Sequence, residues 1–72
     1  MEIEESNAAL GAAIQYAAKN LNGGDFINIS IENGGWDVYM NQENDTYIPR
    51  ADSLIDDILD CVSTSNPDAK YK

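Results

Sequence analysis

Four aspartates within residues 51–62 form the densest group of side chains that could carry chemistry. They are Asp52, Asp56, Asp57 and Asp60, and no lysine or arginine lies among them. Carboxylates can transfer protons, bind hard cations or pair with basic side chains. A carboxylate pair could do acid–base work, but the adjacent Asp56 and Asp57 point to different sides of a helix. The group therefore favours binding over catalysis.

Other catalytic chemistry is also missing. The chain has no histidine, which excludes the commonest general base, Ser-His and Cys-His nucleophiles, and a Cys/His zinc site. The glycine pairs at 23–24 and 34–35 match neither a P-loop nor a dinucleotide fingerprint. A domain of 72 residues buries only about 60% of its unfolded surface, which leaves little room for a desolvated active site. We predict a non-enzymatic protein with no cofactor and no metal.

A calcium loop is the first alternative. Asn41, Glu43, Asp45 and Asp52 fall at positions one, three, five and twelve of an EF-hand-like register. The register fails at position six, where the required glycine is Thr46, and no helix is predicted before the loop. A plain acidic turn is the simpler interpretation.

A carrier protein is the second alternative. Asp52-Ser53-Leu54 resembles the Asp-Ser-Leu of acyl carrier proteins, which implies a phosphopantetheine arm on the serine and an all-helical fold with two further helices. Only 19 residues follow Ser53, and a hairpin is predicted before it. Ser53 is better explained as a helix N-cap.

Charge restricts the class of partner. Thirteen acidic residues against four basic ones give a net charge of −9, and Arg50 is the one base between Asn20 and Cys61. Such a chain repels nucleic acid and anionic membranes and attracts basic proteins. No apolar run approaches the ~20 residues of a membrane span, and the first residues, MEIEES, are acidic where a signal peptide is basic. We expect a cytoplasmic protein.

An amphipathic helix is predicted over residues 7–21, with Ser6 as its N-cap and Asn22-Gly23-Gly24 as its stop. Its apolar stripe comprises Leu10, Ile14, Ala17, Ala18 and Leu21. Because the segment contains many alanines and thus little side-chain bulk, we expect the helix to lie close against a sheet.

Residues 26–41 predict a β-hairpin, because apolar and polar residues alternate along both halves. Asn33-Gly34 is a type I′ turn signal. This turn pairs Ile31 with Trp36, Ile29 with Val38 and Ile27 with Met40, all on one face. The other face then displays Asn28, Ser30, Glu32, Asp37, Tyr39 and Asn41.

The remaining residues predict a short third strand and a second helix. The strand covers Thr46–Ile48 and ends at Pro49. The helix is predicted to begin after Ser53, which stands in capping-box spacing with Asp56, and to end near Ser63. Cys61 lies in its apolar stripe and is expected to be buried as a small hydrophobic residue. The whole chain, 1–72, is predicted to be one α+β domain, with an N-terminal helix, an antiparallel hairpin or three-stranded meander and an acidic C-terminal helix packed on one sheet face. Residues 1–5 and 67–72 are expected to fray.

The aspartates have a plain explanation as a solvated face that keeps a small protein in solution. Against it, aspartate is a poor helix former, and like charges four residues apart cost about 0.2 to 0.5 kcal/mol per pair. Carboxylates one helical turn apart also approach the spacing of phosphates along a nucleic-acid strand. The residues predicted to bind a partner are Asp52, Asp56, Asp57, Asp60, Glu32, Asp37, Tyr39, Glu43 and Asp45.

In size, acidity, lack of histidine and helix-hairpin-helix order, the whole chain resembles small phage-encoded inhibitors that mimic DNA, including anti-CRISPR proteins. The resemblance is one of overall profile and involves no motif. It implies binding of the acidic surface to a basic nucleic-acid-binding protein or a CRISPR surveillance complex, which blocks access of target DNA. The alternative is a small protein-protein interaction or assembly module, a monomer or a homodimer, whose acidity serves solubility alone.

Overall fold

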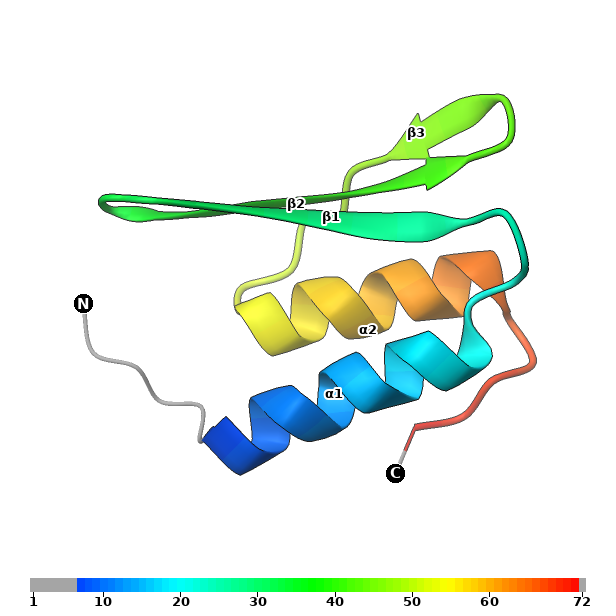
Figure 1. Ribbon diagram of the computed structural model, residues 1–72, viewed down its shortest axis with the longest axis horizontal. Coiled ribbons are helices and arrows are strands. Elements are labelled where there is room, and N and C mark those ends of the chain that lie inside the picture. The colour runs from blue at the N-terminus through cyan, green and yellow to red at the C-terminus, as the bar shows by residue number, and fades with distance from the viewer. Residues whose placement is uncertain (1–6, 72) are drawn as a thin grey trace.

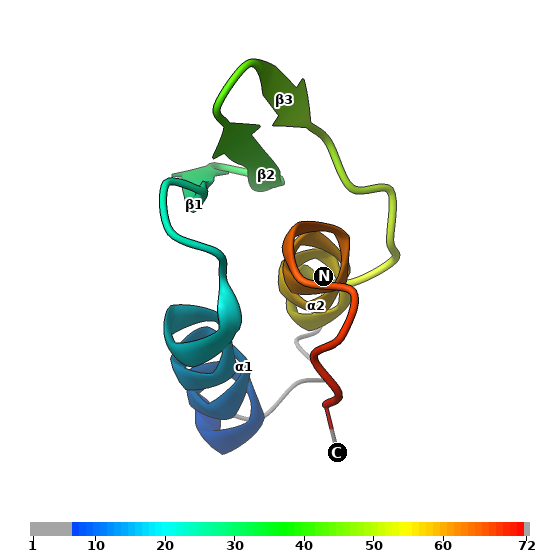
Figure 2. The ribbon, with the colours of Figure 1, turned by 90° about the vertical axis from the view of Figure 1, so that its right-hand side faces the viewer.

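A computed structural model describes residues 7–71 as two helices and three strands. In chain order the elements are α1 (Asn7–Asn20), β1 (Phe26–Glu32), β2 (Gly35–Gln42), β3 (Asp45–Tyr47) and α2 (Leu54–Ser65) (Figure 1). The strands form one antiparallel sheet in the order β1-β2-β3, and both helices lie on the same side of it (Figure 2). The predicted α+β layout, with the acidic C-terminal helix against one sheet face, is confirmed.

The hairpin has the predicted register, with Ile31 opposite Trp36, Ile29 opposite Val38 and Ile27 opposite Met40. The turn lies at Asn33-Gly34, but the predicted type I′ geometry is wrong. That turn needs positive φ at both central residues, whereas Gly34 has φ 103° and no described non-glycine residue has positive φ. Positive φ at the second central residue alone is typical of a type II turn.

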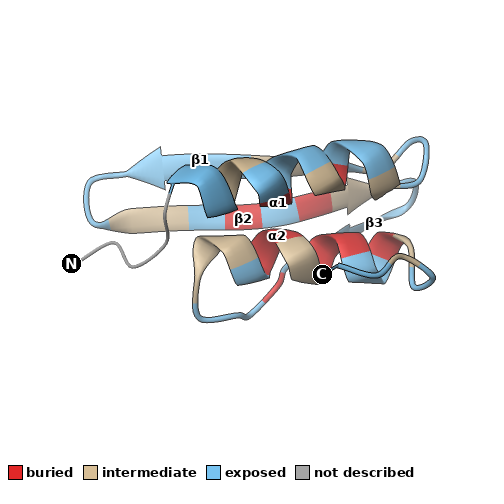
Figure 3. Ribbon diagram, turned by 90° about the horizontal axis from the view of Figure 1, so that it is seen from below, coloured by how far each residue is buried: buried red, intermediate tan, exposed pale blue. Residues whose placement is uncertain are grey.

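The core has two connected parts, both built on α2. On one side of α2, Ile58 and Val62 pack against Ala13 and Ala17 of α1. On the other side, Cys61 packs against Val38 and Met40 of β2 (Figure 3). The expectation that α1 lies mainly on the sheet is therefore wrong, because α1 contacts α2 chiefly. The methyl side chains of Ala13 and Ala17 allow the two helices to approach closely.

The buried stripe of α1 differs from the predicted one. Ala13 and Ala17 are its buried residues, whereas Ile14 is 48% exposed and Ala18 is exposed. The helix turns its smallest side chains toward α2, so the larger Ile14 stays outside. The predicted N-cap, Ser6, and the expected fraying of residues 1–5 lie outside the described residues.

The arrangement of α1 leaves β1 poorly covered. Ile27 packs against both parts of the core, but Ile29 is 39% exposed and Ile31 is 78% exposed. In Figure 3 most of β1 is coloured as exposed, in contrast to β2. One face of an edge strand thus presents isoleucine side chains to solvent.

The segments after β2 depart in detail from the predicted bounds. The second helix extends to Ser65, beyond the predicted end near Ser63. Of residues 67–72, which are expected to fray, Ala69 contacts the helix–helix core and the ring of Tyr71 meets that of Tyr16 edge-on at 4.8 Å between centroids, while residues 67, 68 and 70 are exposed and Lys72 lies outside the described residues. The third strand begins at Asp45 and ends before Ile48, one residue earlier at each end than predicted.

Ser65 joins the end of α2 to the loop between α1 and β1. Its side chain is 5% exposed; Oγ donates to Oδ2 of Asp25 at 2.7 Å and accepts from the backbone N–H of Asn22 at 3.0 Å. The side chain of Asn66 donates to the carbonyl of Asn20 at 2.9 Å. These bonds connect residues forty or more positions apart in sequence and fix the exit of α1.

Candidate partner-binding surface

Asp57 is part of the structure's interior and does not belong to the surface. It is 7% exposed; Oδ2 accepts from the indole Nε1 of Trp36 at 3.1 Å, and Oδ1 accepts from the backbone N–H of Ala51 at 3.0 Å. Because both oxygens are occupied, the prediction that Asp57 contacts a partner is wrong. A signal was present in the sequence: the indole of a core tryptophan in the hairpin needs an acceptor, and Asp57 lies on the side of α2 that carries Leu54 and Ile58.

Asp60 is half-buried and also has an internal contact. Its Oδ2 accepts from the hydroxyl of Tyr47 at 2.8 Å. A hydrogen bond with Thr64 lowers the pKa of Tyr47, but the hydrogen bond to Asp60, burial and the charge of Asp60 together raise that pKa above its usual value. Asp60 therefore holds β3 against α2, which limits its use as a partner contact.

Asp52 and Asp56 are both exposed beside the start of α2. The helix begins at Leu54 with Ser53 as the N-cap, as predicted, and Oγ of Ser53 accepts from the backbone N–H of Asp56 at 3.1 Å. Asp52 thus precedes the helix, while Asp56 lies in its first turn, where the helix dipole favours a negative charge. The predicted row Asp52, Asp56 and Asp60 along one exposed helix face is not present, since Asp52 is outside the helix and Asp60 bonds to Tyr47.

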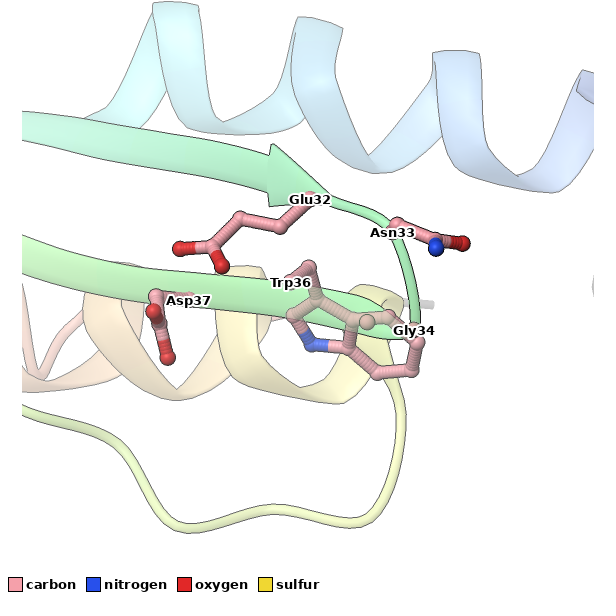
Figure 4. A pocket seen from close by; sticks show the side chains of 6 residues that line it. Glu32, Asn33, Gly34, Trp36 and Asp37 are labelled. Carbon is pink, nitrogen blue, oxygen red and sulfur yellow. The ribbon is translucent and has the colours of Figure 1, made fainter.

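Glu32 and Asp37 are exposed on the sheet face that points away from the helices, at the hairpin end. Asp37 is paired with Ser30, and Glu32 with Gly35, so the two acids are diagonal neighbours on adjacent strands. Figure 4 shows both carboxylates beside Trp36, where residues 32–37 line a shallow hollow. Tyr39, 38% exposed, continues the same face.

The Trp36–Asp57 hydrogen bond ties the hairpin to the first turn of α2. The β1–β2 turn and the start of α2 both lie toward the left of Figure 1. Exposed carboxylates occur on both segments: Glu32 and Asp37 on the hairpin, and Asp52 and Asp56 at the start of the helix. We call Glu32, Asp37, Asp52 and Asp56 the hairpin-end acidic surface. Glu43 and Asp45 are exposed at the β2–β3 turn near the opposite end, where Oδ1 of Asp45 accepts from the backbone N–H of Thr46 at 2.9 Å.

Within residues 7–71, no three cysteine, aspartate or glutamate side chains lie close enough together to hold a metal ion. None of the described helices has the length and apolarity needed to cross a membrane.

No protein-family model, curated protein or solved structure matches this chain.

Proposed function

We propose that this chain is a non-enzymatic inhibitor whose hairpin-end acidic surface occupies the basic nucleic-acid-binding site of another protein. The observation that supports the proposal is that Glu32, Asp37, Asp52 and Asp56 are all exposed, on two segments, the hairpin end and the start of α2, that lie toward the same end of the molecule. Arg50 is the one base in the sequence between residues 20 and 61, so little positive charge offsets this cluster.

The physical basis is electrostatic. A site that binds DNA or RNA is lined with lysine and arginine, and carboxylates held by a folded domain can replace phosphates as their partners. The surface combines two acids on a sheet with two at a helix N-terminus, so that it presents negative charge in more than one direction. A net charge of −9 adds long-range attraction and accelerates the encounter with a basic protein.

Tyr39 supplies an aromatic contact beside the acids. It is 38% exposed on the same sheet face as Asp37, and tyrosine is enriched among the residues that dominate protein interfaces. Such an anchor adds affinity that salt does not screen.

The partner class follows from this chemistry and from the resemblance to phage-encoded DNA mimics. The proposed partner is a basic nucleic-acid-binding protein or complex of the CRISPR effector type, met in a bacterial cytoplasm. The chain itself is proposed to bind neither nucleic acid nor membrane, because its charge repels both. Asp57 and Asp60 are left out of the contact surface, since Trp36 and Tyr47 occupy their oxygens.

The test uses capture of proteins from a bacterial lysate at low and high salt, followed by competition with DNA. Capture of a nucleic-acid-binding protein that is lost at high salt and displaced by DNA supports the proposal. The double variant Asp52→Lys/Asp56→Lys should abolish this capture. Glu43→Lys/Asp45→Lys, which changes the net charge equally at the other turn, should retain most of it. Capture that is unaffected by salt or by Asp52→Lys/Asp56→Lys would overturn the proposal.

A further inference from the structure

Edge strand β1 has an unpaired side. Within residues 7–71 it pairs with β2 alone, so its other edge meets no strand. Sheet edges of this kind are usually protected by a charged side chain pointing inward, a proline, a bulge or a short strand. The seven residues of β1, FINISIE, have none of these features and carry one charge, at Glu32, on the face away from the helices.

The hairpin decides which backbone groups the open edge presents. In a two-residue hairpin the residues that flank the turn, here Glu32 and Gly35, exchange hydrogen bonds with each other, and this role then alternates along the strand. Ser30, Asn28 and Phe26 therefore also direct their N–H and C=O groups toward β2. Ile27, Ile29 and Ile31 direct theirs outward, to the open edge.

We propose that this edge pairs with the same edge of a second copy of the chain, antiparallel and centred on Ile29. In this register Ile29 lies opposite its own copy, and Ile27 lies opposite Ile31 at both ends. These are the residues whose backbone groups are free, so all three positions can exchange hydrogen bonds across the interface. The result is one continuous six-stranded sheet.

Side-chain burial favours the same arrangement. The isoleucines all point to the helix side of the sheet, where Ile31 is 78% and Ile29 39% exposed in the single chain. Pairing brings both copies' isoleucines into adjacent rows and removes their flanks from water. Since cross-strand β-branched pairs stabilise sheets, these rows contribute to association.

Charge placement is compatible with self-association despite a net charge of −9 on each copy. The register places Glu32 opposite Phe26 of the other copy, so the strand's one carboxylate does not face its equivalent. Phe26 is 55% exposed and gains cover from the aliphatic part of the glutamate.

The helix layer also allows the approach. Figure 2 shows α1 below β1 on the helix side, so two paired copies bring their α1 helices near each other. Several exposed residues of α1 are alanines, among them Ala8, Ala12 and Ala18, and small side chains let helices come close. The proposed interface includes Glu32 of the hairpin-end acidic surface, but Asp52 and Asp56 lie on the loop and helix outside it.

The first experiment measures the mass of the full chain by sedimentation equilibrium from micromolar to near-millimolar concentration. We expect twice the 7.9 kDa monomer mass at high concentration. Added salt should leave the dimer intact or strengthen it, because it screens repulsion between two acidic copies. Ile31→Lys should lose the dimer at concentrations where the unmodified chain is dimeric. Ile48→Lys, at a comparably exposed isoleucine outside the sheet, should keep it.

The second experiment tests the register. Directly opposed residues of a hydrogen-bonded pair have Cα atoms about 5.5 Å apart, within the range of a disulfide. Ile29→Cys should therefore cross-link to its copy under mild oxidation, whereas Ile48→Cys should not; Cys61 is fully buried and should not interfere.

A chain that stays monomeric throughout the concentration range, a dimer insensitive to Ile31→Lys, or no cross-link at Ile29→Cys would overturn the proposal. The salt response separates this result from the proposed function. Binding to a basic partner weakens with salt and fails in Asp52→Lys/Asp56→Lys, whereas the dimer does neither.

Discussion

The indole Nε1 of Trp36 donates a hydrogen bond of 3.1 Å to Oδ2 of Asp57, and this contact joins the hairpin to α2. The other oxygen of Asp57 accepts from the backbone N–H of Ala51, which fixes the loop that leads into the helix. Three segments of the chain thus depend on one carboxylate. Its neighbour Asp56 is exposed and has no comparable role.

Asp57→Ala should destabilise the protein by about 2 to 3 kcal/mol, because it removes two hydrogen bonds to a charged acceptor. Asp56→Ala is the matched control and should change the free energy of unfolding by less than about 1 kcal/mol. Urea unfolding of the two variants, followed by the fluorescence of Trp36, measures the difference. Equal stabilities would show that the Trp36–Asp57 contact is not important for the fold.

Ser53→Ala should destabilise the protein by about 1 kcal/mol, because it removes the side-chain oxygen that accepts the N–H of Asp56. Ser53→Thr keeps this oxygen and should retain most of the stability. Thermal unfolding by circular dichroism compares the two variants. If Ser53→Thr lost as much stability as Ser53→Ala, the capping explanation would be wrong.

Ser65→Ala should destabilise the protein by about 1 to 2 kcal/mol, because it leaves the backbone N–H of Asn22 and the carboxylate of Asp25 without the buried hydroxyl that is their partner. Ser63→Ala is the control on the same helix, since Ser63 is exposed and alanine favours a helix. Hydrogen exchange of residues 20–25 should accelerate in Ser65→Ala alone. Unchanged exchange there would mean that Ser65 does not hold the α1–β1 loop.

The buried thiol of Cys61 should cause a specific loss of stability in alkali. Burial, together with the charges of Asp60 and Asp57, raises the pKa of the thiol from 9.0 to about 12. Above pH 9 the unfolded chain releases this proton and the folded chain keeps it, so the contribution to stability is complete below pH 9 and is lost as the pH rises toward 12.

The measurement compares the pH dependence of unfolding in the unmodified chain and Cys61→Ala. Between pH 9 and 12 the unmodified chain should lose about 1.4 kcal/mol more per pH unit than the variant, which corresponds to one proton. Slopes are compared because Cys61→Ala also alters packing. Tyr47, whose pKa is also raised, is present in both proteins; because Cys61 is the smallest of the causes of that shift, the contribution of Tyr47 largely cancels. Parallel slopes would contradict the assignment to Cys61.

Local patterns in the sequence were sufficient to predict the hairpin register and the start of α2. The hairpin register follows from the turn glycine and from the alternation of apolar residues, which places Ile27, Ile29 and Ile31 on one face. The start of α2 follows from Ser53, whose side chain caps the backbone N–H three positions later. Both are short-range effects. The turn type was wrong, because glycine at one central position satisfies either of two turn families.

The predictions that differ from the structure concern residues whose surroundings depend on long-range packing. The alanines of α1 could pack against the sheet or against α2. The spacing of apolar residues along α1 predicts a helix but does not show which of these two surfaces the helix contacts. Likewise, nothing local separates Asp57 from Asp56: one is buried because Trp36, twenty-one positions earlier, supplies a donor. Of the predicted partner-binding residues, the structure brings Glu32, Asp37, Asp52 and Asp56 toward one end, with Tyr39 on the adjoining sheet face. It separates Glu43 and Asp45 and uses Asp57 and Asp60 internally.

The shortness of β3 limits how far association can proceed. In a dimer joined through β1, each outer edge of the six-stranded sheet consists of β3, which has three residues, and of residues 35–39 of β2, which β3 does not cover. This edge carries the carboxylates of Asp37 and Asp45 and is followed closely by Pro49, so it repels an incoming strand of a third acidic copy. Assembly should therefore stop at the dimer. Because the open edge of β1 is already paired in the dimer, the protein avoids fibrous aggregation through that edge.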